Sequence, residues 1–467
     1  MRLLVVVGNC RAYYRFVAPI ISAMGKGVGK TETTLIAPDV AQFFEREAKP
    51  RCALREPVEA INRSTKLMKE LRSVLVYLYW AFLDVQYVTI LEDKGEKKWF
   101  SRPLARFGTF VKPRHILGAG RFLHRIGLNR FFARIVLVFY RLLELLHSPD
   151  RYIVDQIKEI APDVILVTPV IDPMGYDFDY LRAGLGLRIP TVTLIASWDH
   201  LTTKGLLTMV SDRVLVWNDI QIREAREYHA VSTDRFVSVG APVFDRMFEK
   251  RLLQPRSDFC KNARLDPHRP FVLWAATSSL GCDDEKVIAR QFIQEMRKSR
   301  ILKEFQVLIR PHPNAAKIWE DWRVEDAPVW STPGFPNSDE AMRGLYNSIA
   351  HSIAVVGLST SLFLETAILD RPCALIKAAE ADKNANFNKF LHFQYLLNSG
   401  FPEATEDEAD CVRWLAQVAE GRDAGKEARR RLVSSFLRPK GIGRPAAEVA
   451  AEVIFATAKS ARKRRPV

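Results

Sequence analysis

The sequence predicts an α/β protein made of two doubly wound parallel-sheet domains that face a cleft. Short apolar runs, rich in β-branched side chains, alternate with helix-length segments along most of the chain. This rhythm is typical of parallel strands that are covered by helices on both faces. The 467 residues also exceed one ordinary hydrophobic core, since domains usually hold about 100 to 200 residues. We therefore expect two domains of this kind.

The first domain is expected over residues 1–250 and is Rossmann-like. Its predicted strands are Leu3–Val7, Thr34–Ala37, Val164–Thr168, Thr191–Ala196, Val214–Trp217 and Phe236–Val239. Between about residues 64 and 150 the pattern becomes helical and rich in Leu, Phe and Arg. This change of period predicts a basic helical insertion within the first domain.

A change of composition precedes the second domain. Residues 249–270 are charged, contain prolines and lack a strand-like run, so we expect a linker over 251–269. A second Rossmann-like domain is expected over 270–455, followed by a basic tail over 456–467. Its first strand lies in PFVLWAATSS, and the predicted elements after it are helix 284–299, strand Phe305–Ile309, helix 339–350, strand Ile353–Val356, helix 361–369 and strand Cys373–Ile376.

Positive charge gathers in the predicted insertion. The chain has a net charge of +15, and Lys97–Arg141 holds eleven Lys or Arg residues, several aromatic residues and no Asp or Glu. Cationic and aromatic side chains together suit an anionic membrane surface, while a solvated face with packed aromatics and nucleic acid are the alternatives. Because no nucleic-acid-binding signature accompanies the charge, we expect a membrane partner and no nucleic acid.

The cysteine and hydropathy patterns favour a cytoplasmic protein, and the basic aromatic surface adds the expectation that it is peripheral on the inner face of the plasma membrane. The six cysteines are scattered without the spacing of a metal site, so we expect no metal. The opening MRLLVVVGN is expected to be a first strand rather than a signal peptide. The longest apolar stretch, Val74–Leu83, is much shorter than the roughly 20 residues of a membrane span.

Small hydroxyl residues at the start of a predicted helix are the most informative pattern. In VVGLSTSLFLETAIL (Val355–Leu369), a buried strand is followed by Ser359, Thr360 and Ser361, which open the helix. Helix N-termini offer free N–H donors and favour negative charge, so this start suits a diphosphate. An N-cap without a ligand is the alternative. Glu365, one turn later, would accept hydrogen bonds from ribose hydroxyls.

The segment LIRPHPN (Leu308–Asn314) brings a cation and a histidine to the end of another predicted strand. Arg310 and His312 would neutralise the charge that builds on a departing phosphate, and a rigid turn with a surface histidine is the alternative. Thr277 and Ser278 follow the strand in PFVLWAATSS. They complete the candidate donor-binding set.

The loop SWDHLTTKG (Ser197–Gly205) directly follows a predicted strand of the first domain. Ligands of doubly wound sheets bind beyond the carboxyl ends of the strands, so Asp199 or His200 is the candidate base for an acceptor hydroxyl. A helix start without a catalytic role is the alternative. Lys204 in this loop and Asn9 after the first strand are further site candidates.

In their order along the chain, these motifs resemble the GT-B clan of nucleotide-sugar enzymes, most closely the CDP-glycerol glycerophosphotransferase and capsule-polysaccharide transferase families. SWDHLTTKG resembles the tryptophan, histidine, glycine and threonine loop of the glycerophosphotransferases, and LIRPHPN resembles their His-Pro strand end. VGAPVFDRM resembles the close of their first domain, while VGLSTSLFLETAILDRP and RPKGIGRPAAEVAAEVI are similar in character to their diphosphate helix and last helix. The similarity covers residues 161–454. Asp199 stands where that family has a catalytic His, and His200 follows it, so both remain candidates for the base.

The resemblance implies a metal-independent GT-B transferase. Such an enzyme would move a sugar, or a polyol phosphate, from a nucleotide sugar or CDP-polyol donor to a glycan or lipid-linked acceptor of a cell-surface polysaccharide. The nucleotide-activated donor is then a substrate and not a cofactor. The alternatives are an enzyme like the UDP-N-acetylglucosamine 2-epimerases, which share the fold and a His-Pro-Asn strand end, and a catalytically inactive GT-B binding protein.

Overall fold

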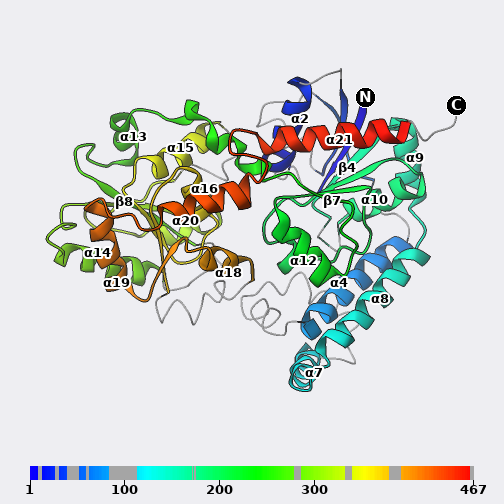
Figure 1. Cartoon of the computed structure of the whole chain (residues 1–467), viewed down its shortest axis with the longest axis horizontal. Coiled ribbons are helices and arrows are strands. Elements are labelled where there is room, and N and C mark those ends of the chain that lie inside the picture. The colour runs from blue at the N-terminus through cyan, green and yellow to red at the C-terminus, as the bar shows by residue number, and fades with distance from the viewer. Residues whose placement is uncertain are drawn as a thin grey trace. The chain divides into compact units, whose positions relative to one another are not determined.

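The computed structural model divides the chain into two units, each built on its own parallel β-sheet (Figure 1). The first unit comprises Met1–Val243 together with Arg438–Val467, and the second comprises Phe244–Leu437. The structure describes residues 1–8, 13–26, 31–38, 52–58, 63–83, 113–170, 172, 175–277, 285–331, 339–377 and 391–462.

Among the described residues, seven parallel strands form the sheet of the first unit. They are β1 (Arg2–Val7), β2 (Glu32–Ile36), β3 (Ala53–Arg55), β4 (Val164–Thr168), β5 (Thr191–Leu194), β6 (Arg213–Val216) and β7 (Phe236–Ser238). Their order is β3-β2-β1-β4-β5-β6-β7, so the strand order reverses between β1 and β4. This reversal makes the sheet doubly wound, and it directs attention to the carboxyl ends of the strands.

Helices cover both faces of this sheet. They are α2 (Ala18–Lys26), α9 (Arg151–Ile160), α10 (Asp177–Gly186), α11 (His200–Thr203), α12 (Asp219–His229) and α21 (Ala446–Arg462), with the π-helix η1 (Tyr13–Val17) before α2. Successive side chains of a strand point to opposite sides of the sheet. Accordingly, Leu3 and Val5 of β1 lie in a core with residues of α2 and α21, whereas Leu4 and Val6 lie in a core with residues of α9 and α10.

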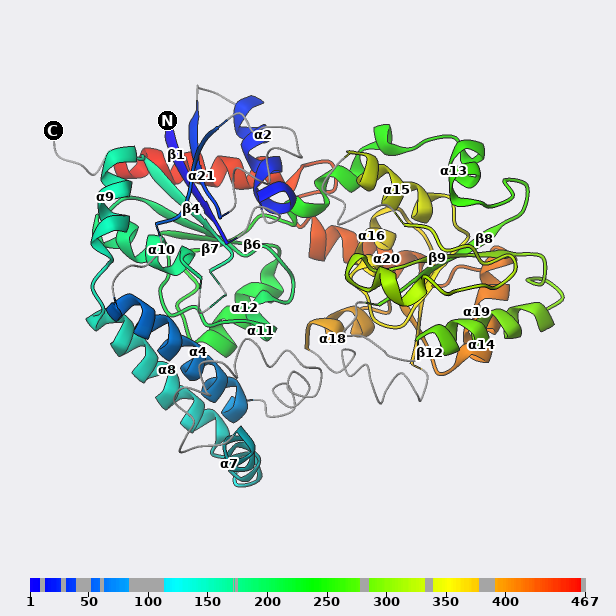
Figure 2. The same ribbon diagram turned by 180° about the vertical axis from the view of Figure 1, so that it is seen from behind.

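Three further helices form an arm on the first unit. They are α4 (Arg63–Leu83), α7 (Pro113–Arg125) and α8 (Asn129–Leu146). Figures 1 and 2 show α4 and α8 side by side, with α7 at the end of the arm that lies away from the sheet. The arm falls within the predicted basic insertion, of which residues 84–112 lie outside the described residues. None of the described helices is long and apolar enough to cross a membrane.

A buried ion-pair network fixes the arm to α10. Arg72 of α4 donates from Nε to Oε1 of Glu144 in α8 (2.7 Å) and from Nη1 to Oδ1 of Asp179 in α10 (3.0 Å). All three side chains are buried. Removing one partner of a buried pair leaves an unpaired charge and commonly costs about 3 to 5 kcal/mol. Charge pairing therefore orients α8 on the body of the unit in addition to apolar packing.

In the described part of the second unit, five parallel strands form the sheet. They are β8 (Phe271–Ala275), β9 (Gln306–Arg310), β10 (Val355–Gly357), β11 (Cys373–Ile376) and β12 (Glu403–Thr405), in the order β12-β11-β10-β8-β9. Because all pairs are parallel, the residues that follow these strands share one edge of the sheet. Most strand residues are fully buried, as expected for a sheet covered on both faces.

The helices of the second unit are α13 (Arg256–Ala263), α14 (Glu285–Lys298), α15 (Asp339–Ala350), α16 (Leu362–Ile368), α18 (Leu391–Asn398), α19 (Glu408–Ala419) and α20 (Lys426–Leu432). Shorter turns are η2 (Pro242–Phe248), η3 (Lys250–Leu252), η4 (Pro313–Trp319) and the π-helix η6 (Val433–Leu437). The helices α14 and α19 pack side by side against the sheet, and Phe292 of α14 and Leu415 of α19 share a core with Trp274 of β8. The predicted class of two parallel-sheet α/β domains is confirmed.

The stretch expected to be a linker, 251–269, has structure of its own. It contains α13, which buries Phe259, Cys260 and Ala263 on one side, and it belongs to the second unit. The segment lacks a strand-like run because its apolar residues are spaced for a helix.

The end of the chain also differs from the expected ranges. The sequence pattern places residues 270–455 in the second domain, yet the chain from Arg438 onward belongs to the first unit, and the expected tail 456–467 begins inside α21. The physical reason is the apolar face of α21, since Ala450 and Ile454 lie in the core with β1.

Candidate functional site

Four predicted donor-binding residues lie at the carboxyl edge of the sheet in the second unit. Arg310 is the last residue of β9, Thr277 follows β8, Ser359 follows β10, and Glu365 lies in α16 after Ser359. This is the edge at which ligands of doubly wound folds bind. Ser278, the remaining member beside Thr277, lies outside the described residues.

Arg310 is a buried cation with unused hydrogen-bonding capacity. Only 9% of its surface is exposed, and its guanidinium carbon lies 5.4 Å from the centre of the Trp330 ring. Burial lowers the pKa of Arg310 to about 10, and the charge of Glu365 opposes this shift, so the guanidinium stays charged at neutral pH. Among the described residues its Nη1 has no hydrogen-bond partner. Buried donors are rarely left unpaired, so this position suits an anionic ligand.

Ser359 is the second buried polar group at this edge that has unused capacity. Its exposed fraction is 8%, and its Oγ has no hydrogen-bond partner in the described part of the chain. Thr360 differs, because its Oγ1 accepts a hydrogen bond from the backbone N–H of Leu362 at 3.3 Å. Ser361 is exposed and makes no side-chain cap. Of the three predicted hydroxyls, that of Ser359 is thus the one buried and available for a ligand.

The helix α16 contributes less than its sequence pattern indicated. It spans only seven residues, Leu362–Ile368, and a helix dipole acts mainly through its terminal turns. The charge of Arg310, rather than α16 alone, is the stronger attraction for an anion at this edge.

His312 lies two residues beyond Arg310, at the start of η4. Its Nδ1 accepts a hydrogen bond from the backbone N–H of Asn314 at 3.2 Å, so the side chain caps η4. In the neutral ring the proton then resides on Nε2, which makes Nε2 a donor. The side chain is partly exposed, as a residue that contacts a ligand needs to be.

Thr277 is engaged by a residue that sequence reasoning missed. Its backbone N–H lies 3.0 Å from both carboxylate oxygens of Glu285, and its hydroxyl donates to Oε2 at 2.8 Å. Trp274 Nε1 donates to the same carboxylate at 3.2 Å. Burial raises the pKa of Glu285 to about 7, although these hydrogen bonds favour its charged form. The hydroxyl of Thr277 therefore retains only acceptor capacity for a ligand. The sequence feature that could have pointed to Glu285 is an acidic residue in the first turn of a predicted helix.

The loop after β5 in the first unit holds the two candidate bases. Asp199 Oδ1 accepts from Ser197 Oγ at 2.6 Å, and Asp199 Oδ2 accepts from Thr203 Oγ1 at 3.1 Å. These bonds close the loop and the single turn α11. Asp199 is partly exposed, and its carboxylate braces the loop.

His200 opens α11 and differs from Asp199 in its surroundings. It is 8% exposed, and its Nδ1 has no hydrogen-bond partner among the described residues. Burial lowers the pKa of His200 to about 4, with the Asp199 charge opposing the shift and Lys204 adding to it. The ring is therefore neutral at pH 7, and its Nδ1 is a hydrogen-bond acceptor when the proton lies on Nε2.

Two residues that are distant from this loop in sequence form hydrogen bonds with it. Trp80 of α4 donates from Nε1 to the carbonyl oxygen of Lys204 at 2.8 Å. The buried His229 bonds Leu201 O through Nε2 (2.8 Å) and accepts the N–H of Leu207 at Nδ1 (3.1 Å). Sequence reasoning missed both supports, because neither residue belongs to a local motif.

The predicted residues thus fall into two groups in two units. Arg310, Ser359, Glu365 and Thr277 share one sheet edge of the second unit, whereas the loop 197–205 lies at a strand end of the first. Asn9 lies outside the described residues. In the part of the chain that the structure describes, no cluster of three or more His, Cys, Asp or Glu residues is arranged to hold a metal ion.

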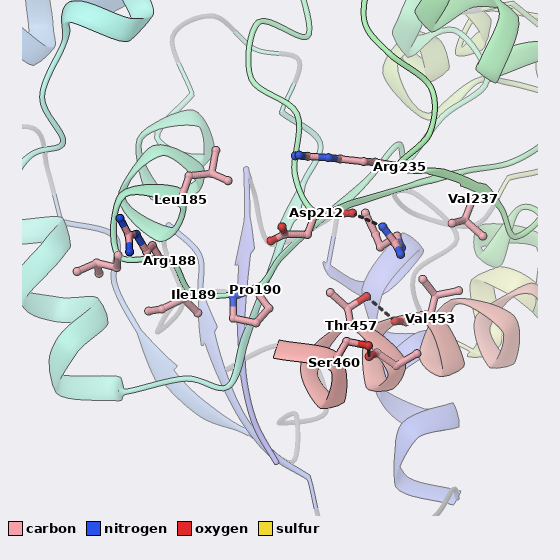
Figure 3. Close-up of a pocket in the computed structure, with 13 residues that line it drawn as sticks. Leu185, Arg188, Ile189, Pro190, Asp212, Arg235, Val237, Val453, Thr457 and Ser460 are labelled. Carbon is pink, nitrogen blue, oxygen red and sulfur yellow. Dashed lines mark hydrogen bonds between the residues drawn. The ribbon is translucent and has the colours of Figure 1, made fainter. Parts of the chain in front are cut away.

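A pocket of about 1040 Å³ lies at the opposite edge of the first unit's sheet (Figure 3). Pro190, Asp212 and Arg235 line it just before β5, β6 and β7, and Thr457 and Ser460 of α21 line it from the other side. None of the predicted site residues is among its lining residues. Its arginines are exposed, and it lies at the amino ends of the strands, away from the edge where the candidate bases lie.

Solved structures of low sequence identity share this fold over nearly the whole chain. UDP-GlcNAc 2-epimerase from Neisseria meningitidis, solved with UDP-GlcNAc bound, is similar with a TM-score of 0.55 at 12% identity, covering 98% of this chain and 100% of that one. UDP-GlcNAc 2-epimerase from Methanocaldococcus jannaschii gives a TM-score of 0.54 at 12% identity, covering 98% and 100%. A glycosyltransferase from Rickettsia africae gives 0.50 at 10% identity, covering 99% of each chain.

These likenesses confirm the GT-B-like fold, and at such identities they show the fold alone. No protein-family model and no curated protein sequence matches the chain.

Proposed function

We propose that the chain is a GT-B glycosyltransferase that moves a sugar from a nucleotide-activated donor to a hydroxyl of a surface glycan or lipid-linked acceptor. The observation that supports this most directly is the pair of buried groups with unused hydrogen-bonding capacity, Arg310 Nη1 and Ser359 Oγ, at the carboxyl edge of one sheet. A charged donor and a hydroxyl that are both shielded from water suit the phosphates of a nucleotide. A CDP-polyol donor with transfer of a polyol phosphate is the variant of this proposal.

In the proposed reaction the second unit binds the donor and stabilises its leaving group. Arg310 would pair with the phosphates. Ser359 would donate a hydrogen bond to them from its hydroxyl, and His312 would donate one from Nε2. Negative charge grows on the phosphate oxygen when the bond to the sugar carbon breaks, and fixed donors in a shielded site stabilise that charge. We expect turnover without an added divalent cation, and activity in excess chelator tests this point.

The first unit would activate the acceptor. His200 or Asp199 takes the proton from the acceptor hydroxyl, the hydroxyl oxygen forms the new bond to the sugar carbon, and the nucleoside diphosphate leaves with the electrons of the broken bond. Lys204, in the same loop, would attract an acceptor that carries phosphate. A lipid-linked acceptor also fits a peripheral enzyme on the inner face of the plasma membrane.

The second candidate function is that of a UDP-N-acetylglucosamine 2-epimerase-like enzyme. It is favoured by the similar structures, of which the Neisseria meningitidis enzyme was solved with UDP-GlcNAc bound. Epimerisation needs one substrate and leaves the sugar linked to the nucleotide. A catalytically inactive binding protein with the same fold is the remaining alternative.

One series of experiments separates these functions. Thermal shift with UDP-, CDP-, GDP- and CMP-linked compounds would identify the preferred nucleotide, and product analysis with and without acceptor would follow. A transferase releases nucleoside diphosphate when a suitable acceptor is added. Conversion of the donor sugar without acceptor would favour the epimerase, and stabilisation by nucleotide without either product would favour the inactive protein.

A further inference from the structure

One face of α8 exposes a continuous row of apolar side chains. Its members are Phe131, Ile135, Val138, Phe139, Leu142, Leu145 and Leu146, each between 48% and 83% exposed. Their spacing of three or four residues places them on one side of a helix. Phe122 of α7 and Ile126 and Leu128 in the following turn are exposed as well, at 61%, 48% and 44%. We call these ten residues the apolar face of the arm.

The opposite side of α8 is already used. Ala133, Leu137, Tyr140 and Glu144 are buried against the rest of the unit, so the apolar face points away from the core. Isolated exposed apolar residues are ordinary in soluble proteins, but a contiguous group of this size marks an interaction surface.

The charges around this face are cationic. Arg121, Arg125, Arg130 and Arg134 are exposed on the same two helices. The acidic residue of these helices, Glu144, is buried and paired with Arg72. Glu227 of α12 lies 3.5 Å from Arg130, and both side chains are at least half exposed.

We propose that the apolar face of α7 and α8 inserts into the interface of a bilayer that contains anionic lipid. Apolar side chains bury into the boundary between headgroups and acyl chains, while flanking arginines pair with lipid phosphates, which is the arrangement of an interfacial helix. A second copy of the chain is less suited to this face, because a symmetric contact would bring the same arginines together. The inference goes beyond the nucleotide chemistry and does not depend on it.

Vesicle flotation of the full chain tests the proposal. We expect the protein to float with phosphatidylcholine vesicles that contain phosphatidylglycerol, at least tenfold more than with phosphatidylcholine alone. Raising the salt from about 0.1 M to 1 M shortens the screening length from about 10 Å to 3 Å, so binding should fall.

Paired variants separate the two contributions. The double variant Phe139→Ser, Leu142→Ser should reduce flotation at least tenfold, and Arg125→Gln, Arg134→Gln should remove the preference for anionic vesicles. As matched controls, Leu253→Ser with Val287→Ser, and Arg413→Gln with Arg422→Gln, alter exposed side chains of the second unit and should change nothing. All these positions are exposed, so unchanged melting temperatures are expected.

Two outcomes would overturn the inference. The first is flotation that the Phe139 and Leu142 variant leaves intact. The second is absence of vesicle binding together with a dimer, seen by sedimentation, that the same variant dissociates. That second result would assign the face to another copy of the chain.

Discussion

Trp80 donates its indole hydrogen to the carbonyl oxygen of Lys204 at 2.8 Å, which joins the helical arm to the loop of candidate bases. The bond spans 124 residues of sequence. Trp80 is buried, and its ring lies edge-on to that of His229, which bonds the same loop at Leu201. The arm is therefore part of the support of the loop, and not only an addition to the surface of the unit.

Trp80→Phe should keep most of the ring packing and delete this hydrogen bond. We expect a stability loss of about 1 kcal/mol and a fall in turnover of several-fold with unchanged donor affinity, because the loop loses its outer support. Turnover and donor binding measured on the same preparation test this expectation.

Trp322→Phe is the matched control, since Trp322 Nε1 donates to Ala327 O at 3.0 Å within the second unit, to which the loop does not belong. It should lose similar stability without the same fall in turnover. An equal fall in both variants would mean that general destabilisation, rather than the loop, limits the reaction.

Arg310→Met should weaken nucleotide binding while it retains an apolar stem of similar length. The lost charge-assisted hydrogen bond amounts to about 1.5 to 3 kcal/mol, or roughly ten- to a hundredfold in affinity. Ser359→Ala removes a neutral donor, and we expect about fivefold weaker binding. Calorimetry with the preferred nucleotide measures both effects.

The exposed Arg413, which pairs with Asp410, supplies the control Arg413→Met with no expected change in affinity. Wild-type affinity in a folded Arg310→Met protein would place the phosphate site elsewhere in the chain.

The sequence was most informative where a strand is a continuous apolar run. Val164–Thr168 and Cys373–Ile376 were predicted with the bounds that β4 and β11 have in the structure. The strands β3 and β12 were missed, because each has only three residues and at least two of them are not buried. Both lie at the edge of a sheet. A strand there is less enclosed than a central strand, so its side chains need not all be apolar.

The strand-end positions of the candidate site residues could be predicted, but their hydrogen-bond partners could not. The rule that ligands bind beyond strand ends located Arg310 and Ser359, and the structure adds that both have hydrogen-bonding groups without partners among the described residues. The engagement of Thr277 by Glu285 was not predictable, because it depends on where the first turn of α14 lies relative to the end of β8 and not on residue type. The contact of Trp80 with the loop depends likewise on tertiary packing.

Glu285→Gln should change how stability depends on pH. Burial raises the pKa of Glu285 from 4.5 to about 7 in the folded chain, so between these values the folded chain keeps a proton that the unfolded chain releases. The stability that this group contributes is full below pH 4.5 and is lost as the pH rises to about 7, a difference of about 3 kcal/mol. The free energy of unfolding of the variant minus that of wild type should therefore be more positive at pH 8 than at pH 5.

Denaturant unfolding at the two pH values measures this difference, and Glu427→Gln at an exposed site is the matched control. A constant offset between wild type and Glu285→Gln would contradict the raised pKa.

Substitutions in the loop after β5 test which residue accepts the acceptor's proton. Both oxygens of Asp199 accept hydrogen bonds within the loop, whereas Nδ1 of His200 is buried with no hydrogen-bond partner in the described part of the chain. We therefore expect His200→Ala to lower turnover by about 10² to 10⁴ with donor affinity nearly unchanged. Asp199→Asn keeps the size of the side chain and part of its hydrogen bonding, so it should be milder.

The pH dependence supplies a second, independent readout. Because burial lowers the pKa of His200 to about 4, the base stays deprotonated down to that pH, and the acid limb of kcat/KM should lie near pH 4 instead of near 6.5. The measurement needs a complete acceptor, since a truncated one would make binding limiting and hide the effect. A larger loss in Asp199→Asn than in His200→Ala would transfer the role of base to Asp199. If neither variant lowers turnover tenfold while both remain folded, the loop is a structural turn and the acceptor is activated from another strand end.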